Sequence, residues 1–497
     1  LIRTNMNGAI DLSRKGDMLI SFNEKKGQYY ALDLNTNIEK CITCDAKGRN
    51  WVNDVNGMPM DPNPVQAFGF DQSGTRYYMA DETDVFEYDF TKGILNNLSD
   101  NRGKKENKEF RFLALSSDSS FVDLSRTALK VFDKKTKGNE IYEWIDGAFE
   151  KTNVADAQIV YFNTSKDGSV KLLRKNTVAE YANLQIAVNG GEWKQISTAN
   201  TFKSEYKWAT VDLIKWKSYK GLELEGLVYK PEDYDPAKSY PMIVYYYETY
   251  SESLHAYHGA RPTASIVHPT EYASNDYIIF IPDIYYNPGF PARGAYDCIM
   301  SGTDYVLKQY PNIDKNRMGL QGQSWGGYQT AMLITQSNRF KAAMAGAPVS
   351  NMFSAFGGIR WGTGMSRMGQ YEKGQSRIGK TIWEAPELYV ENSPLFHIPK
   401  IKTPLLIMAN DQDGAVPWYQ GIEMFMGMRR LQKPVWMLNY NGDDHNLMKT
   451  ANRYDLSIRM MQFFDYYLQN KPMPVWMKEG IPAVVKDKEM RYELVEE

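Results

Sequence analysis

The spacing of hydrophobic residues along the chain changes near residue 205. Before it, short runs such as DMLISF, QYYALDL, TRYYMA and SVKLLRK alternate with polar turns such as KKGQ, DQSGT and SKDGS. Short apolar and aromatic runs between turns that contain Gly and Asp are typical of antiparallel strands. Residues 1–205 are therefore predicted to form an all-β domain without a long helix.

The spacing of these strands favours a β-propeller over a sandwich or a barrel. The segment FGFDQSGTRY at 68–77, followed by VFEYDF, has the pattern of the inner strands of a propeller blade. At about 40–50 residues per blade, this part of the chain has room for four or five blades. The domain is predicted to resemble part of a propeller.

From residue 206 onward, compact apolar runs alternate with longer segments of helical periodicity. The runs PMIVYYY, YIIFIPDI, NRMGLQG, KAAMAGAP, TPLLIMAN and PVWMLNY have the composition of strands buried on both faces. Helices are predicted at 292–309, 326–338, 418–432 and 451–469. This alternation predicts a doubly wound α/β sheet over 206–475, and the charged residues 476–497 are predicted to form a C-terminal tail.

Composition narrows the classes of partner. The net charge of -2 gives no electrostatic reason to expect binding to nucleic acid, and no run of about 18 apolar residues predicts a membrane span. Three cysteines are too few for a disulfide scaffold. Cys41 and Cys44 lack the two further ligands of a zinc site and are interpreted as a structural pair, either reduced or bridged. No metal and no cofactor is expected.

One short motif carries candidate chemistry. In GLQGQSWGGYQ at 319–329, Ser324 stands between glycines, after an apolar strand and before a segment of helical periodicity. This is the context of a nucleophile elbow, in which a serine occupies a strained strand-to-helix turn. Gly322 and Gly326 are expected where a side chain would have no room. A Gly-rich turn that arose by chance is the alternative.

A serine hydroxyl needs a base, and the base needs a carboxylate. His445 follows the PVWML strand, where an α/β-hydrolase carries its base. The loop after TPLLIMAN supplies the acid, for which Asp413 is favoured and Asp411 is the alternative. The remaining histidines are assigned structural or surface roles; they are His255, His258, His268 and His397.

The oxyanion of an acyl transfer needs two hydrogen-bond donors. The elbow offers the backbone N–H of Trp325. The loop after PMIVYYY lacks the Gly-Gly run that supplies the second donor in many hydrolases, so a tyrosine hydroxyl is expected in its place.

These motifs resemble the peptidase domain of the prolyl oligopeptidase family over about 206–475. The residues that carry the resemblance are GQSWGGY, DGAVP, DDHNL and the YPMIV strand that leads to Tyr247. The resemblance implies that Ser324 is the nucleophile, Asp413 the acid and His445 the base, and that the Tyr247 hydroxyl completes the oxyanion hole. It also implies a propeller, which would be incomplete in this chain, and favours a periplasmic or secreted protein over a cytoplasmic one.

The sequence departs from the dipeptidyl peptidases of that family. Paired tyrosines are missing after APVS, Ala415 stands two residues after the acid, and no paired-glutamate motif occurs. Glu248 is interpreted either as a partner for a substrate ammonium or as a loop carboxylate facing water. The wall of the specificity pocket is assigned by position, to Val349, Met352, Phe353 and Val416.

The predicted function is hydrolysis of oligopeptides through an acyl-enzyme. An esterase that uses the same triad, and a peptide-binding protein without activity, are the alternatives. The peptide bond preferred, the mode of cleavage and assembly into a homo-oligomer stay open at this stage.

Overall fold

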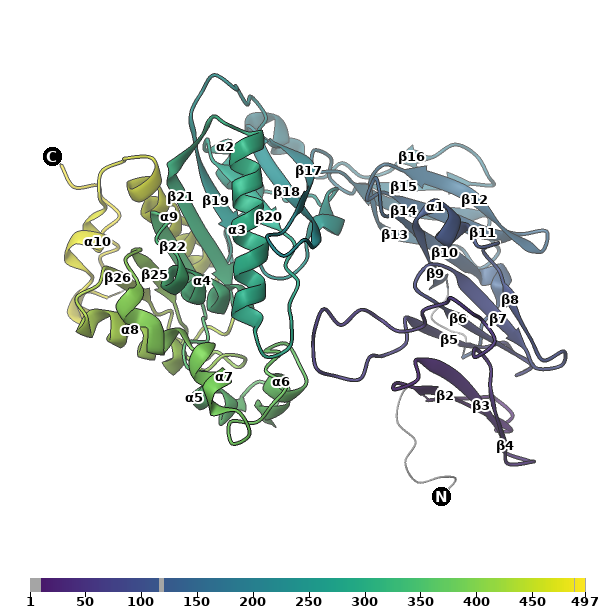
Figure 1. The fold of residues 1–497 in the computed structure, drawn as a ribbon. Helices are drawn as coiled ribbons and strands as arrows, with labels where there is room; N and C mark the ends of the chain where they lie inside the picture. Colours follow the sequence, from purple (N-terminus) through teal and green to yellow (C-terminus); the bar gives the residue numbers. More distant parts are fainter. Residues whose placement is uncertain (1–9, 116–119, 487, 497) are drawn as a thin grey trace. The chain divides into compact units, whose positions relative to one another are not determined.

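The computed structural model describes residues 10–115, 120–486 and 488–496, and the chain divides into two compact units (Figure 1). The first unit comprises the described residues up to Val55 together with Met60–Asn200 and His255–Tyr257. The second comprises Asn56–Pro59, Thr201–Leu254 and the residues from His258 onward.

Four antiparallel sheets, each of four strands in chain order, make up the first unit. Their strands are β1 (Ile10–Leu12), β2 (Met18–Asn23), β3 (Gln28–Asp33) and β4 (Ile38–Cys41); β5 (Gln66–Phe70), β6 (Arg76–Ala80), β7 (Val85–Asp89) and β8 (Ile94–Asn97); β9 (Lys108–Ala114), β10 (Thr127–Asp133), β11 (Asn139–Ile145) and β12 (Ala148–Ala155); and β13 (Gln158–Thr164), β14 (Val170–Asn176), β15 (Leu184–Val188) and β16 (Lys194–Gln195). One short helix, α1 (Arg102–Glu106), and a 3-10 turn at Leu124–Arg126 interrupt the strands.

Successive sheets pack face to face, because alternate residues of one strand enter different cores. In β6, Tyr77 and Met79 belong to a core shared with the β1–β4 sheet. Tyr78 and Ala80, on the opposite face, belong to a core shared with the β9–β12 sheet. A third core joins the β9–β12 sheet to the β13–β16 sheet. This stacking of four-stranded meanders is the arrangement of propeller blades.

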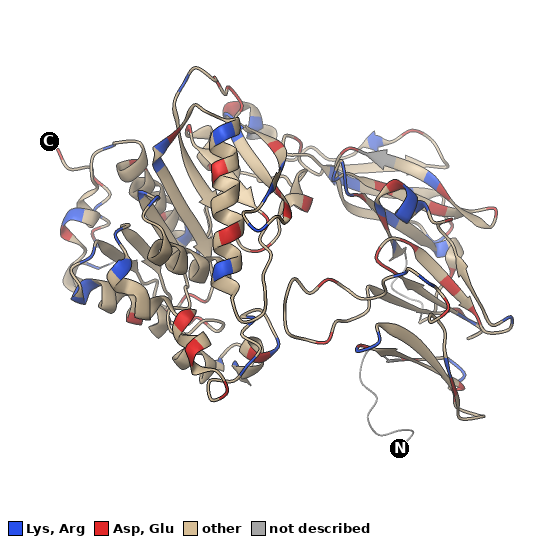
Figure 2. Cartoon of the chain, in the orientation of Figure 1, with Lys and Arg blue, Asp and Glu red and all other residues tan. Residues whose placement is uncertain are grey.

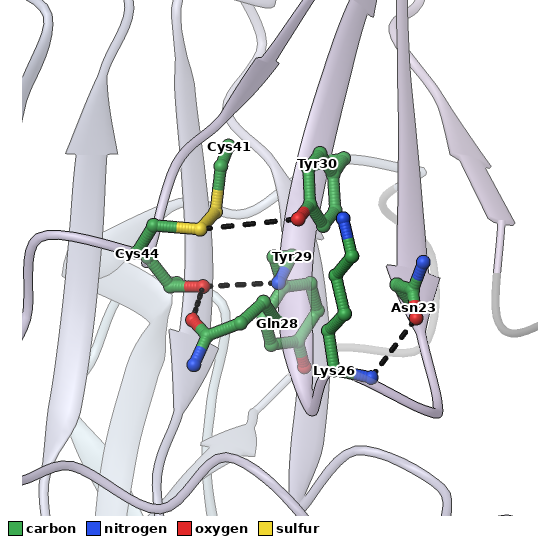
Figure 3. Close-up of a disulfide and its surroundings, with 8 residues drawn as sticks. Asn23, Lys26, Gln28, Tyr29, Tyr30, Cys41 and Cys44 are labelled. Carbon is green, nitrogen blue, oxygen red and sulfur yellow. Dashed lines mark hydrogen bonds between the residues drawn. A yellow bond between two sulfur atoms is a disulfide. The ribbon is translucent and has the colours of Figure 1, made fainter.

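A disulfide lies at the end of the first sheet (Figure 3). Cys41 ends β4, is paired in register with Tyr30 of β3, and is bonded to Cys44. The Tyr30 hydroxyl lies 3.9 Å from the Sγ of Cys44, and the Lys26 amine lies 5.4 Å from the centre of the Tyr30 ring. Of the two states left open by the sequence, the structure therefore has the bridged one.

The second unit is built on an eight-stranded sheet with the order β17-β18-β20-β19-β21-β22-β25-β26. Its strands are β17 (Ala209–Lys217), β18 (Glu223–Pro231), β19 (Tyr240–Tyr245), β20 (Ile278–Pro282), β21 (Ile313–Gln323), β22 (Ala342–Gly346), β25 (Leu405–Met408) and β26 (Val435–Leu438). The first two strands form an antiparallel hairpin, and the strands from β20 to β26 pair in parallel. The carboxyl ends of the parallel strands thus meet at one edge of the sheet.

Helices lie between the parallel strands and after the last of them. They are α2 (Pro269–Ser274), α3 (Pro291–Gln309), α4 (Trp325–Gln336), α5 (Met352–Phe356), α6 (Met368–Glu372), α7 (Pro386–Glu391), α8 (Tyr419–Arg430), α9 (Thr450–Leu468) and α10 (Val475–Glu479). Four of them, α3, α4, α8 and α9, match the helices that the periodicity predicts. Shorter elements are the hairpin β23 (Ile359–Arg360) and β24 (Met365–Ser366) and 3-10 turns at Thr201–Glu205, Ser251–Ser253, Pro394–Lys400 and Ala483–Val485. Across the described residues, none of the helices has the length and apolar character that a membrane crossing requires.

The segment assigned to a C-terminal tail folds back onto the second unit. Trp476 is 3% exposed, and its indole Nε1 donates to Gln462 of α9 at 2.8 Å. The Tyr492 hydroxyl donates to Asp455 Oδ1 at 2.5 Å, also on α9. The buried indole gives this segment an anchor that its charged composition does not suggest.

Candidate active site

Ser324 stands on the turn between β21 and α4, with φ 59° and ψ -113°. A positive φ is costly for a residue with a Cβ and persists only where the surroundings enforce it. The Ser324 amide donates to Gly346 O at 2.8 Å, and its carbonyl oxygen accepts from the Tyr328 amide at 2.9 Å. These bonds fix the turn between the strand and the first turn of the helix.

The glycines around Ser324 are required by close contacts of the backbone. A Cβ on Gly322 would lie 2.3 Å from the backbone of Gly326, and a Cβ on Gly326 would lie 2.4 Å from the carbonyl oxygen of Tyr246. A Cβ on Gly327 would lie 2.3 Å from Gly346 O. The motif therefore has the tight geometry of a nucleophile elbow, which a chance Gly-rich turn would not need.

Asp413 and His445 meet through their side chains. His445 Nδ1 lies 2.8 Å from Asp413 Oδ2. The other carboxylate oxygen, Oδ1, accepts from the amides of Ala415 at 2.8 Å and Val416 at 2.7 Å, which fixes the carboxylate plane. The Asp413 side chain is 1% exposed and the imidazole 18%, so the acid is buried behind a ring that solvent reaches.

The other acids of these two loops have different partners. Asp411 accepts from the Gly442 amide at 2.7 Å, and Asp443 accepts from the Met448 amide at 2.9 Å. Asp444 accepts from the Gly414 amide at 2.8 Å, which joins the two loops. Asp413 is thus the acid that reaches the imidazole, in preference to the Asp411 alternative.

A hydrogen bond ties the loop of His445 to the elbow. Gln323, directly before Ser324, donates from Nε2 to the carbonyl oxygen of His445 at 2.8 Å. The side chains of Ser324 and His445 line the same cavity, which has a volume of about 530 Å³.

Tyr247 also lines this cavity, and a network on its far side fixes it. Gln375 Nε2 donates to the Tyr247 hydroxyl oxygen at 2.8 Å and to Glu248 Oε1 at 3.2 Å. Glu248 is ion-paired at 3.0 Å with Arg377, whose side chain is fully buried. Because Gln375 occupies a lone pair of the phenol oxygen, the phenol proton is left to donate to another group.

The backbone N–H of Trp325 stands at the start of α4, where helix amides have no intrahelical acceptor. The Trp325 ring is held by stacking on Tyr328 and by donation from Nε1 to the Tyr286 hydroxyl at 3.1 Å. Tyr246, in contrast, is buried with its hydroxyl 2.9 Å from Thr330 Oγ1.

Of the pocket-wall residues assigned by position, Val416 lines the cavity. Val349 and Met352 are buried in the main core of the unit, and Phe353 packs against that core from its edge. The Glu248 carboxylate, which is 22% exposed, binds the buried Arg377, a contact that the sequence did not predict.

The remaining histidines lie away from the acid. His255 groups with the first unit, and His397 Nε2 lies 3.1 Å from Glu391 O. His268 lines the cavity, is 4% exposed, and has neither ring nitrogen within hydrogen-bond distance of a described group. Burial, with contributions from His258 and Arg261, lowers the pKa of the His268 imidazole to about 3, so the ring is neutral at physiological pH.

Comparison with known proteins gives a match within the second unit. Residues 292–471, which contain the elbow, the acid loop and His445, match the model of the prolyl oligopeptidase family. The family resemblance drawn from the sequence is thereby confirmed.

Similar proteins include an uncharacterized peptidase, YuxL, of Bacillus subtilis, which is 26% identical over 273 residues. That match covers 53% of this chain and 40% of the relative. The acylamino-acid-releasing enzyme of Sus scrofa is 25% identical over 254 residues, with 48% and 33% coverage. The chain thus spans less than half the length of either relative.

A solved structure extends the likeness to both units. The acylaminoacyl peptidase of Pyrococcus horikoshii is 16% identical, with a TM-score of 0.59 over 96% of this chain and 91% of that one. At such low identity the likeness concerns the fold alone. The predicted fold class, an α/β-hydrolase sheet preceded by a propeller-like all-β domain, is confirmed.

Three residues of the site were not found from the sequence, namely Arg367, Gln375 and Arg377. All lie between α5 and α7, in a segment without strong periodicity. Arg367 follows a hairpin that pairs in only two positions, and Arg377 has a φ of 55°. A signal existed only in composition, since the stretch GIRWGTGMSRMGQ is rich in Gly and Arg.

Proposed function

We propose that this chain is a serine peptidase that hydrolyses oligopeptides through an acyl-enzyme. The observation that carries the proposal is the 2.8 Å contact between Asp413 and His445, together with the cavity that His445 and Ser324, on its strained turn, both line. The match of residues 292–471 to the prolyl oligopeptidase family model supports the same reaction class.

In the proposed reaction, the Ser324 hydroxyl attacks the scissile carbonyl while His445 accepts its proton. Asp413 holds the imidazole in the tautomer that presents Nε2 to the serine, and stabilises the imidazolium. The oxyanion accepts hydrogen bonds from the Trp325 amide and the Tyr247 hydroxyl. His445 then protonates the leaving amine, and water repeats the sequence on the acyl-enzyme.

The fixed geometry explains why each group suits its role. Both lone-pair regions of Asp413 are occupied, Oδ1 by two amides and Oδ2 by the imidazole, so the ring cannot turn without losing a buried charge-assisted bond. The elbow presents the hydroxyl above the helix N-terminus, where the first amides face the developing negative charge.

Labelling with a fluorophosphonate tests the nucleophile. The wild type should be labelled at Ser324, whereas Ser324→Ala should not; Ser337→Ala, which changes the serine that ends α4, serves as the control. Equal labelling of wild type and Ser324→Ala would overturn the assignment.

The reaction class needs a second measurement. Mass spectrometry of a mixed peptide library should show cleavage products with the wild type and none with Ser324→Ala. Hydrolysis of aryl esters without cleavage of any peptide amide would replace the peptidase by an esterase that uses the same residues.

A further inference from the structure

The cavity around Ser324 is lined by four arginines, and the described residues of its lining include no Asp or Glu. The arginines are Arg261, Arg360, Arg367 and Arg453. Elsewhere positively and negatively charged residues are mixed. The chain has a net charge of -2, and Figure 2 shows basic and acidic residues interspersed along the elements of both units. The cavity is thus a local concentration of positive charge in a nearly neutral protein.

Of the four arginines, Arg367 is the one whose burial and hydrogen bonds point to a particular ligand. It is 1% exposed and stands between β24 and α6. One terminal nitrogen, Nη1, donates to the carbonyl oxygen of Ala415, two residues after the acid. Its Nε and Nη2 are buried without a hydrogen-bond partner among the described groups.

A buried guanidinium without a carboxylate partner is unusual, and among the described residues Arg367 has only neutral hydrogen-bonding neighbours, the Ala415 carbonyl and the Tyr371 hydroxyl. Buried charges are normally paired, because leaving a charged donor unsatisfied carries a large desolvation penalty. Burial raises the pKa of the Tyr371 phenol, with the charge of Arg367 and a hydrogen bond from it acting in the opposite direction, so this neighbour stays a neutral group. An anion at this wall of the cavity would supply the acceptor that the fold omits.

The neighbouring groups favour an anion of carboxylate type. His268 is neutral and adds no charge, while Arg453 is oriented by donation from Nε to Leu447 O at 2.6 Å. Guanidinium groups bind carboxylates through two parallel hydrogen bonds. Arg261 and Arg360 are exposed, so salt screens them and they attract an anion without fixing its position.

We propose that this cavity selects peptides that carry a carboxylate next to the scissile bond, with Arg367 as the residue that determines this specificity. The inference rests on the proposed peptidase function. The carboxylate comes either from an Asp or Glu side chain or from the C-terminus of a short peptide, and both sources offer the same chemistry to the guanidinium.

Matched fluorogenic peptides separate these sources. One pair differs by Glu against Gln beside the scissile bond, with the C-terminus amidated. A second pair keeps Gln and differs by a free acid against an amide at the C-terminus. For at least one pair, the carboxylate form should have a kcat/KM higher by on the order of 10- to 100-fold, as for a hydrogen bond to a charged group. That advantage should shrink as salt is raised.

Arg367→Gln should bring the ratio of kcat/KM for the carboxylate peptide to that for its neutral partner close to one. Arg430→Gln, at the exposed end of α8, should leave this ratio unchanged. Should Arg367→Gln fail to fold, Arg453→Gln and the salt dependence of the wild type provide the test, with a smaller loss expected for Arg453→Gln.

The outcomes distinguish the two proposals. Equal cleavage of both members of each pair by the wild type, at low and high salt, overturns the carboxylate specificity and leaves the peptidase intact. Faster cleavage of the neutral peptide in each pair would also overturn the carboxylate specificity and leave the peptidase intact. Absence of cleavage of every peptide, together with labelling at Ser324, overturns the peptidase proposal and the specificity with it.

Discussion

The contact between Gln375 and Tyr247 allows a double-mutant test of the proposed oxyanion site. Gln375 Nε2 donates to the Tyr247 hydroxyl oxygen at 2.8 Å, which leaves the phenol proton for the substrate oxyanion. Tyr247→Phe removes that proton donor and keeps the ring. Loss of one oxyanion donor costs about 10²–10³ in kcat, and we expect a loss of this size with KM little changed.

Gln375→Met keeps the length of the side chain but removes its donor. Gln375→Met removes two hydrogen bonds, one to the phenol and one to Glu248. The bond to the phenol is neutral and worth about 0.5–1.5 kcal/mol, and it is the one that orients the proposed oxyanion donor, so kcat should fall roughly 2- to 13-fold. In the Tyr247→Phe background the same change should alter kcat less than about twofold, because the hydroxyl that Gln375 orients is already gone.

The assay is hydrolysis of one peptide amide under saturating conditions, normalised to active sites by fluorophosphonate titration. Gln336→Met, at the exposed end of α4, is the matched control and should be neutral. If Gln375→Met slows the Tyr247→Phe enzyme as much as it slows the wild type, Gln375 acts independently of the phenol and the reasoning is wrong.

Three further predictions concern the fold around the site and the first unit. Gly327→Ala should destabilise the protein by about 1–3 kcal/mol, because its Cβ would lie 2.3 Å from a carbonyl oxygen. The control Gly369→Ala, whose Cβ would point into open space, should not. Equal urea unfolding midpoints for the two variants would contradict this prediction. Denatured protein should take up one alkylating group without reductant and three with it, because Cys41 and Cys44 are bonded; three groups without reductant would contradict the bridge. His268 stays neutral in the folded state down to about pH 3 but binds a proton below about pH 6.5 when unfolded. Acidification from pH 7.5 to pH 5 should therefore reduce the free energy of unfolding of the wild type by about 2 kcal/mol more than that of His268→Phe. Equal changes in the free energy of unfolding for the two proteins, measured in urea at both pH values, would refute this.

The regular elements and the order of the motifs were accessible to sequence reasoning. Periodicity placed the helix 292–309 at Pro291–Gln309 and the helix 451–469 at Thr450–Leu468. Chain order predicted that Ser324, Asp413 and His445 follow three different parallel strands. Since the carboxyl ends of such strands share one edge, no detailed geometry was needed to bring these residues together.

Contacts between irregular segments that lie far apart in the sequence could not be predicted from the sequence. Glu248 and Arg377 are separated by 129 positions, and neither lies in a pattern that predicts the other. Val349 and Met352 were assigned to a pocket wall by their distance from the strand. The structure places both in the core: Val349 in the loop that precedes α5, and Met352 on the first turn of α5, which directs its side chain inward. Sequence position alone does not decide which face of a short helix meets a cavity.

The four residues Asn56–Pro59 have a consequence for how the peptidase unit forms. They belong to the second unit although the chain before and after them belongs to the first. Arg377 donates from Nε to Asn56 O at 2.8 Å, and Gly57 fits so closely against Tyr286 that a Cβ there would lie 2.3 Å from its carbonyl oxygen. A fragment that begins at Thr201 would leave this guanidinium without that acceptor. A single crossover near Thr201 would separate Arg377 from Asn56, so an exchange of the second unit between relatives should carry residues 56–59 with it.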